Sequence, residues 1–158
     1  MLMHLLTTAL NWNFVLVTAI SASLTAQLIK VLLNLFIFHR FIAERMWGAG
    51  GMPSSHSATV CAMVVATGRY CGVNSAVFAV AAVLSIIVMY DAMGVRYETG
   101  EQAKLLNRMF TEWMDQGSEA LPFLKNGKKL KEMVGHTPIE VLTGAVLGIL
   151  IGFAMPMP

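Results

Sequence analysis

Four long apolar runs, separated by polar stretches, dominate the pattern of hydrophobic and polar positions along the chain. They cover residues 13–38, 57–70, 75–93 and 138–157. As a helix, the first run is long enough to cross about 30 Å of hydrocarbon with some tilt, whereas the second is short for a span. The pattern therefore predicts an all-α fold, a polytopic transmembrane helix bundle of about four spans.

The polar residues between these runs predict how the spans are connected. Residues 71–74 are few enough to join the second and third spans into an antiparallel helical hairpin. The other polar residues collect at 39–52 and 95–135, which lie on one side of the membrane if the chain crosses four times. Because these two loops hold nine of the eleven lysines and arginines, the positive-inside rule places them in the cytoplasm and both termini outside.

The second of these loops contains a predicted helix of its own. Its apolar residues recur at helical spacing opposite a charged face, which predicts an amphipathic interfacial helix that lies on the headgroups or caps the bundle. These apolar residues are Ala103, Leu106, Met109, Phe110 and Trp113. The lysine-rich residues 125–131 that follow either sit against anionic headgroups or form a solvated basic loop, and the sequence does not decide between the two.

The composition agrees with a membrane protein. Hydrophobic residues make up 56% of the chain and charged residues only 13%, against about 25% charged residues in a soluble domain. The net charge of +2 is small and no basic stripe is interleaved with aromatic residues, so no nucleic-acid partner is expected. Without a long repeat or low-complexity segment, residues 1–158 are expected to form a single integral membrane domain.

A polar stripe runs through the first apolar stretch, where polar side chains are costly. At 100° per residue its members fall within roughly 60° of one helix face, and they are Ser23, Gln27, Lys30 and Asn34. The stripe predicts that Lys30 and Gln27 face the interior of the bundle and serve the function. The alternative is a purely structural seam of hydrogen bonds between helices.

Two helix starts carry histidines. Ser54, Ser55, His56 and Ser57 follow two glycines and open the second span. Either Ser54 or Ser55 is a suitable N-cap, while the free N–H groups of a helix start can bind an anion and His56 adds a titratable proton donor.

At the start of the fourth span, Thr137 and Glu140 form a predicted capping box with Pro138 in the first helical position. Glu140 also stands four residues after His136 and can share its face, so it either caps the helix or orients the imidazole. Further along, a glycine in every fourth position forms a packing seam, made of Gly144, Gly148 and Gly152.

Asp91 and Arg96 close the third span on the same side of the membrane. They either pair with one another or supply a carboxylate and a phosphate-binding guanidinium to a site. The four segments thus direct a common set of polar residues toward one cytoplasmic opening, with Lys30 deepest. This set is Lys30, His56, Asp91, Arg96, His136 and Glu140.

These motifs resemble the type 2 phosphatidic acid phosphatase superfamily, relatives of the vanadium haloperoxidases, and specifically its small divergent bacterial branch. Residues 53–56, Pro-Ser-Ser-His, resemble the family's Pro-Ser-Gly-His, and His136 with Glu140 resembles its His-x-x-x-Asp. Residues 91–96 and 100–107 resemble signatures of the divergent branch. Two phosphate-binding arginines of the family have no direct equivalent, and Arg96 or a residue of 128–131 is the expected substitute.

The resemblance implies a phosphatase that hydrolyses a lipid phosphate or polyprenyl diphosphate in the bacterial cytoplasmic membrane. The charge bias of the loops places its site on the cytoplasmic side. The resemblance also implies that His136 is the nucleophile, Glu140 its orienting carboxylate and His56 the acid and base, with no metal or other cofactor. The expected substrate-binding residues are Lys30, Gln27, Ser54, Ser55, Ser57, Asp91 and Arg96.

Two other functions stay open at this stage. One is a non-catalytic transporter or scaffold that keeps the phosphate pocket. The other is a metal-dependent hydrolase, since histidine and carboxylate side chains can ligate an ion; its ligands would be His56, His136, Asp91 and Glu140. Because a four-span bundle is small for a lipid site, a homodimer along the glycine seam is a further possibility.

Overall fold

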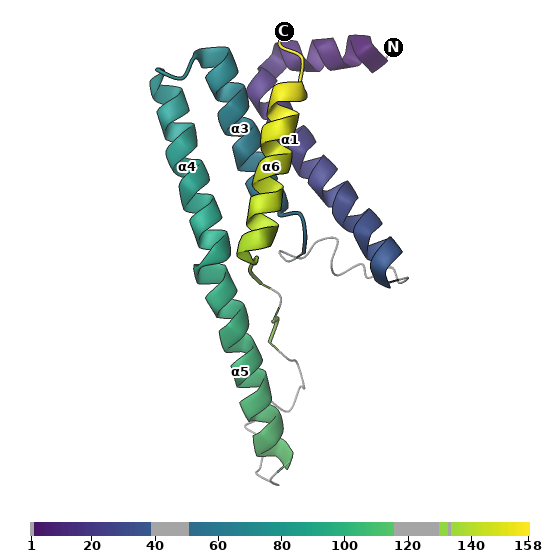
Figure 1. The fold of residues 1–158 in the computed structure, drawn as a ribbon, viewed down its shortest axis with the longest axis vertical. Helices are drawn as coiled ribbons and strands as arrows, with labels where there is room; N and C mark the ends of the chain where they lie inside the picture. The colour runs from purple at the N-terminus through teal and green to yellow at the C-terminus, as the bar shows by residue number, and fades with distance from the viewer. Residues whose placement is uncertain (1, 39–50, 116–129, 133) are drawn as a thin grey trace.

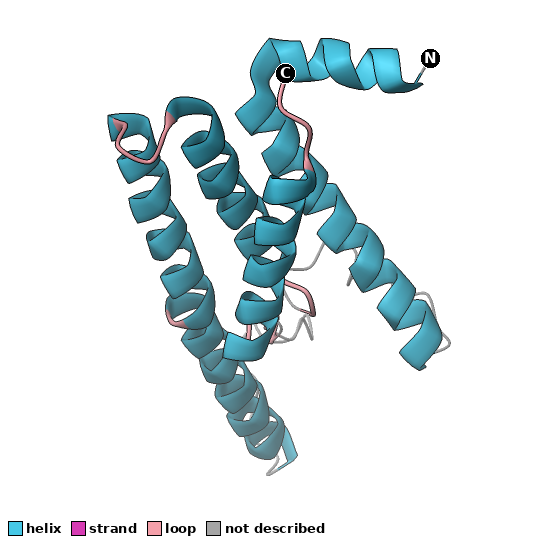
Figure 2. Ribbon diagram, turned by 45° about the horizontal axis from the view of Figure 1, so that its top comes forward, coloured by secondary structure: helices cyan, strands magenta, loops and turns pink. Residues whose placement is uncertain are grey.

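The predicted all-α fold is confirmed. The computed structural model describes residues 2–38, 51–115, 130–132 and 134–158, and these ranges contain helices and no strand (Figures 1 and 2). The helices are α1 (Leu2–Phe38), α3 (Ser55–Cys71), α4 (Ala76–Met93), α5 (Val95–Asp115) and α6 (Pro138–Ala154).

Helix α1 is kinked at Asn13. This residue has non-helical φ and ψ angles of −164° and 96°, and its side-chain oxygen accepts a hydrogen bond of 3.0 Å from the backbone N–H of Leu16. Asn13 therefore acts as the N-cap of a second helical segment, and the apolar span begins at Asn13 as predicted. The arm before the kink turns across the end of the bundle that also holds the C-terminus (Figure 1).

Helix α3 is the centre of the bundle because it packs against α1, α4 and α6. Small residues make this close packing possible: Ala58 and Ala62 of α3 are fully buried against Ala22 and Ala26 of α1. Helix α3 is 17 residues long, which agrees with the short second run in the sequence.

The glycine seam of α6 packs against α3 within the same chain. A Cβ atom added at Gly144 would meet the carbonyl oxygen of Ser54, and one added at Gly148 would meet the carbonyl oxygen of Ala58. All three seam glycines are buried. The idea that this seam joins two copies of the chain was therefore wrong, because α3 already occupies it; a homodimer stays a prediction and would need another face.

Substitution of Gly148 by alanine is expected to lower the free energy of unfolding by about 1–3 kcal/mol, because the new methyl group must push α6 away from the α3 backbone. The sign of this change in the free energy of unfolding is diagnostic, since glycine to alanine inside an unobstructed helix stabilises a protein by about 1 kcal/mol. Thermal unfolding in detergent measures the effect. Leu150→Ala is the control, because that side chain is 61% exposed on the outer side of α6. A midpoint raised by Gly148→Ala would contradict the packing.

The outer surface of the bundle suits lipid. Two described stretches, Asn13–Phe36 and Ala76–Trp113, are long and apolar enough to cross a membrane, while the apolar α6 is shorter. Large apolar side chains point outward from several helices, such as Leu24 at 65%, Val80 at 67% and Leu142 at 64% exposure. The number of spans itself stays a prediction.

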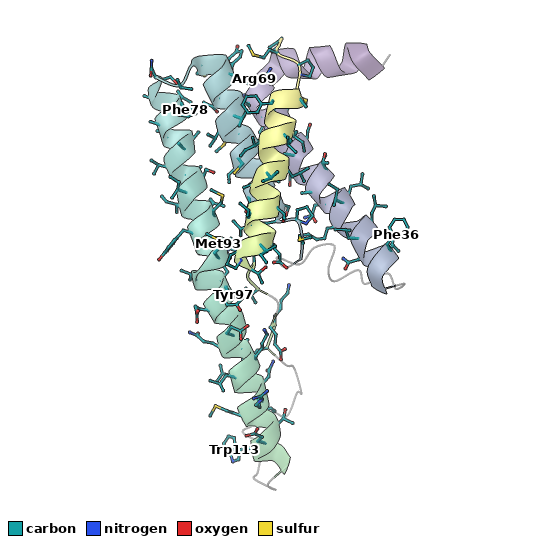
Figure 3. The ribbon with its side chains drawn as sticks, viewed as in Figure 1. Phe36, Arg69, Phe78, Met93, Tyr97 and Trp113 are labelled. Carbon is teal, nitrogen blue, oxygen red and sulfur yellow. The ribbon has the colours of Figure 1, made fainter. Side chains whose placement is uncertain are left out.

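The ends of the bundle differ in chemistry. At one end, Arg69 donates hydrogen bonds to the carbonyl oxygens of Gly152 at 2.6 Å and Met155 at 2.8 Å. It thereby closes the C-terminal end of α6, a favourable place for a cation. At the other end lie the C-terminal end of α4 and the N-terminal ends of α3 and α6, so the two histidine motifs meet there as predicted (Figures 1 and 3).

Helix α5 continues beyond the bundle at the histidine end (Figure 3). It contains the predicted amphipathic helix, whose residues Leu106, Met109 and Trp113 are exposed. Its contact with headgroups stays a prediction. Most of residues 39–52 and 125–131, including the lysines at 125, 128 and 129, lie outside the described residues.

Candidate functional site

His136 is held in a fixed position at the start of α6. Its side chain is 1% exposed, and its backbone N–H donates a 3.0 Å hydrogen bond to the carbonyl oxygen of Ala92 at the end of α4. Its Nδ1 lies 3.1 Å from Oε2 of Glu140. The ring is therefore fixed from two sides, by its backbone and by a carboxylate.

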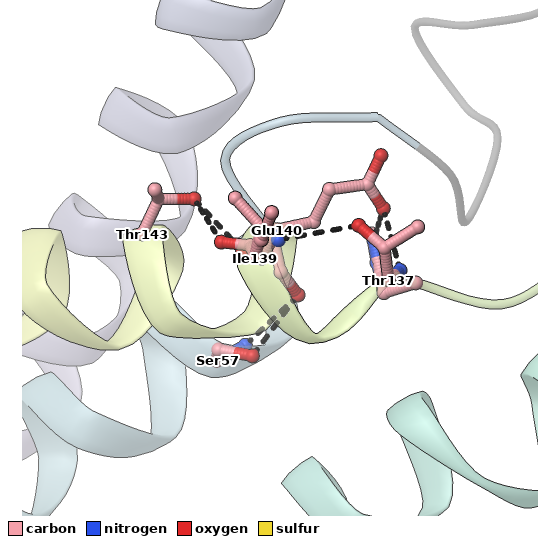
Figure 4. A network of polar contacts seen from close by, with 7 residues as sticks. Ser57, Thr137, Ile139, Glu140 and Thr143 are labelled. Atoms are coloured by element: carbon pink, nitrogen blue, oxygen red, sulfur yellow. Dashed lines mark hydrogen bonds and ion pairs between the residues drawn. The ribbon is translucent and has the colours of Figure 1, made fainter.

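Glu140 performs both of the roles that the sequence left open. Its Oε2 accepts a hydrogen bond of 3.1 Å from the backbone N–H of Thr137, and its own backbone N–H donates to Oγ1 of Thr137 at 3.4 Å. This reciprocal pair is the predicted capping box (Figure 4). The oxygen that caps the helix is also the oxygen that contacts the imidazole, so capping positions the carboxylate for His136.

The opposite nitrogen of His136 faces the site. The carboxylate favours the tautomer with the proton on Nδ1, and in that tautomer Nε2 carries the lone pair. Nε2 is buried and has no hydrogen-bond partner among the described residues. A buried acceptor without a partner is uncommon in a folded protein, which marks this nitrogen as a position for a ligand or a reacting atom.

The N-terminal turn of α3 is tied directly to the start of α6. Ser54 is the N-cap, and its backbone N–H donates a 3.0 Å hydrogen bond to the carbonyl oxygen of Glu140. Its hydroxyl accepts hydrogen bonds from the backbone N–H and the hydroxyl of Ser57, at 3.4 and 3.1 Å. These hydroxyls therefore support one another, so any contact of Ser54 or Ser57 with substrate stays a prediction.

His56 comes next to His136 from the first turn of α3. The centroids of the two rings are 6.0 Å apart and the rings meet edge to face. His56 is exposed, in contrast to the buried His136. The pair thus combines a fixed, sheltered imidazole with one that is open to solvent.

Lys30 and Gln27 reach this region from α1. Lys30 is 2% exposed, and its Nζ has no hydrogen-bond partner among the described residues. Oε1 of Gln27 is also buried without a described partner. Nε2 of Gln27 lies 3.5 Å from the hydroxyl of Ser55. Through Gln27 and Ser55, the polar stripe of α1 contacts the N-terminal turn of α3 that carries His56.

Asp91 and Arg96 form a pair at the edge of the site. Nε of Arg96 lies 2.5 Å from Oδ2 of Asp91, with the side chains 51% and 38% exposed. Of the two roles that the sequence left open, the pair is observed, and contact with a phosphate stays a prediction.

Comparison with known proteins agrees with this arrangement. A family model described as the divergent PAP2 family matches residues 11–151. The chain belongs to the divergent PAP2 family. It is 40% identical over 144 residues to the "Uncharacterized membrane protein YuiD" of Bacillus subtilis (strain 168), a match that covers 88% of this chain and 91% of the relative. No solved structure matches.

The family membership and the relative support association with a membrane and a relation to PAP2 proteins. Every predicted site residue of this divergent PAP2 chain lies inside the matched range. Across the described residues, no group of three or more His, Cys, Asp or Glu side chains is gathered in a way that suits a metal ion.

Two parts of the site were missed in the sequence. Gly51 has a φ angle of +96°, and a Cβ there would lie 3.5 Å from Cδ of Lys30, so this glycine covers the lysine stem. The carbonyl oxygen of Ala92, which holds His136, carries no side-chain signal at all. The two glycines at 50 and 51 indicated a close backbone approach before α3, whereas the contact of His136 with Ala92 depends on segments that are distant in the sequence.

Proposed function

We propose that this divergent PAP2 protein is a membrane phosphatase that hydrolyses a lipid phosphate or polyprenyl diphosphate through a phosphohistidine on Nε2 of His136. The observation that carries the proposal is the buried imidazole itself. Glu140 holds its Nδ1 at 3.1 Å, and Nε2 is buried without a partner among the described residues. A buried cation, Lys30, lies in the same region and also has no described partner.

The first chemical step transfers the phosphoryl group to the protein. Nε2 of His136 attacks phosphorus, the bond from phosphorus to the leaving oxygen breaks, and His56 donates a proton to that oxygen. The imidazole becomes positively charged as the P–N bond forms, and the carboxylate of Glu140 offsets this charge.

The second step returns the protein to its starting state. His56, now neutral, takes a proton from a water molecule, whose oxygen attacks phosphorus. The P–N bond breaks, inorganic phosphate leaves, and His136 recovers its lone pair. The exposure of His56 gives it access to this water.

Cations and helix N–H groups hold the phosphoryl oxygens. An ammonium buried without a partner is costly, so Lys30 favours a bound anion, and the first turn of α3 offers further N–H donors. We assign Arg96, which pairs with Asp91 close to the end of α4, as a second cation for the phosphate or diphosphate. Ser55, Ser57, Gln27 and Asp91 complete the proposed binding residues.

The substrate class follows from the position of the site. It lies at one end of an apolar bundle, where the helices meet polar segments and where a phosphate headgroup is within reach while its chains stay in lipid. The excess of lysine and arginine in the adjoining segments favours the cytoplasmic side of a bacterial inner membrane for this end.

The proposal is tested with the purified full-length protein in lipid nanodiscs. Phosphate release is measured from phosphatidic acid, a polyprenyl phosphate and a polyprenyl diphosphate, with and without a chelator, for wild type, His136→Ala and the outward-facing control Leu150→Ala. Release by wild type and control but not by His136→Ala supports the proposal. Undiminished release by His136→Ala contradicts it. Binding without turnover favours a non-catalytic protein, and loss on chelation that a divalent ion restores favours a metal-dependent hydrolase.

Glu140→Gln is expected to lower kcat by about 10²-fold or more, because an uncharged amide no longer offsets the imidazolium or fixes its tautomer. The free energy of unfolding should change by no more than about 0.5 kcal/mol, since glutamine also completes a capping box. Phosphate release and thermal unfolding separate the two roles. Glu140→Ala, which loses the cap as well, should cost about 1 kcal/mol of stability. An unchanged kcat in Glu140→Gln would exclude the orienting role.

A further inference from the structure

The segment that leads into α6 lies along α5 (Figure 1). Its described residues, 130–132 and 134–136, are named the strap here. At one end of the strap, the side-chain amide of Asn107 pairs with the backbone of Leu130: Oδ1 accepts from the N–H at 2.9 Å, and Nδ2 donates to the carbonyl oxygen at 2.9 Å. Nδ2 also lies 2.7 Å from Oε1 of Glu132. One side chain thus contacts the strap at three points.

Two glycines allow the strap to approach the helix at backbone distance. A Cβ atom at Gly100 would meet the carbonyl oxygen of Glu132, and one at Gly135 would meet the backbone of Arg96 and Tyr97. Any side chain in either place would lift the strap from α5. The register of the strap on the helix is therefore fixed by contacts along its length.

The other end of the strap is His136 itself. Its N–H donates to the carbonyl oxygen of Ala92 at 3.0 Å, in the last turn of α4. His136 is thus the last residue of a segment that α5 holds in register, and the first turn of α6 follows directly after it.

We infer that Asn107 is a positioning residue for His136. It acts through the strap and touches no reacting atom. Its amide fixes the position of Leu130 along α5, and the strap thereby fixes the position of the His136 backbone. The inference rests on the proposed function for its catalytic consequence, but the contact itself is testable without it. Strap binding then explains two residues of the 100–107 motif. Gly100 allows the close approach of the strap, and the Asn107 amide clamps Leu130 and Glu132.

The test compares Asn107→Ala with Gln102→Ala, an amide on an exposed face of the same helix. Amide hydrogen exchange of the full-length protein in nanodiscs should show faster exchange in peptides covering 130–136 for Asn107→Ala only, with α3 unchanged. In the phosphatase assay kcat should fall at least about tenfold and KM should stay within about twofold, because the nucleophile is displaced while the cationic pocket is kept.

A compensating pair distinguishes positioning from general destabilisation. Asn107→Asp alone should behave like Asn107→Ala, because the new carboxylate faces Glu132. Adding Glu132→Gln gives that carboxylate a donor but leaves the carbonyl oxygen of Leu130 without one, so the double variant should recover part of the protection of the strap and part of kcat. Unchanged exchange in Asn107→Ala would overturn the clamp, and faster exchange with normal kcat would overturn the positioning role. If wild type releases no phosphate, the proposed function fails while the exchange measurement still decides the clamp.

Discussion

Phosphate from the substrate is expected to remain bound to the His56→Ala protein and to be absent from the His136→Ala protein. The two histidines are 6.0 Å apart between ring centroids but differ in burial, and the proposed chemistry gives them separate steps. With a diphosphate, whose leaving group needs little protonation, His136 can still attack when His56 is missing. Water attack then lacks its base and slows by about 10²–10⁴-fold, so the phosphohistidine accumulates.

The measurement uses a substrate labelled in the transferred phosphate, followed by rapid denaturation of the protein. The label should be stable in base and labile in acid, as expected for phosphorus on nitrogen, and should map to the peptide that contains His136. The double variant His56→Ala/His136→Ala is the control and should carry no label. Label retained by His136→Ala would assign the nucleophile to a different residue, and phosphate release without any labelled protein would favour direct attack by water.

The arrangement of the site at one end of the bundle could be predicted because it follows from connectivity. Antiparallel spans bring the end of one helix next to the start of another, so His56 and His136, each at a helix start after a polar loop, were expected at the same end of the bundle. The capping box of Thr137 and Glu140 could also be predicted, since it depends on residues three apart. Such local rules need no knowledge of tertiary packing.

Other features depended on distances that a sequence does not contain. Glycine at every fourth position predicts close helix packing but does not name the partner, and α3 turned out to occupy the seam rather than a second chain. The roles of Glu140 could not be separated, because one carboxylate oxygen serves the cap and the imidazole together. The pairing of Asn107 with Leu130 spans 23 residues and joins a side chain to a backbone, so no periodicity reveals it.

The polar stripe of α1 shows what the structure adds to a correct prediction. Periodicity placed Lys30 on an inward face but left open whether it serves a structural seam or a site. A structural lysine would have partners for its ammonium, whereas Nζ of Lys30 is buried and has none among the described residues. A bound anion would offset the free energy cost of burying this ammonium without a described partner, which favours the functional interpretation.

Substitution of Lys30 by methionine is therefore expected to abolish measurable phosphate release while making the protein more stable. Methionine keeps a flexible chain of similar length but removes a buried ammonium without a described partner, which is costly inside a membrane protein, so the midpoint of thermal unfolding should rise in the absence of substrate. Added inorganic phosphate should raise the unfolding midpoint of wild type toward that of Lys30→Met, since only the wild-type pocket binds the anion.

Leu28→Met is the matched control, because Leu28 is 59% exposed on the outer side of α1 and should change neither property. A binding role predicts opposite effects of the substitution on stability and on activity. Replacement of a residue needed for folding would instead lower both. A lower unfolding midpoint in Lys30→Met would make Lys30 part of a structural seam. A higher midpoint with normal phosphate release would instead show that the ammonium is buried without serving the site, and the anion would then have to be held by the α3 N-terminus and Arg96.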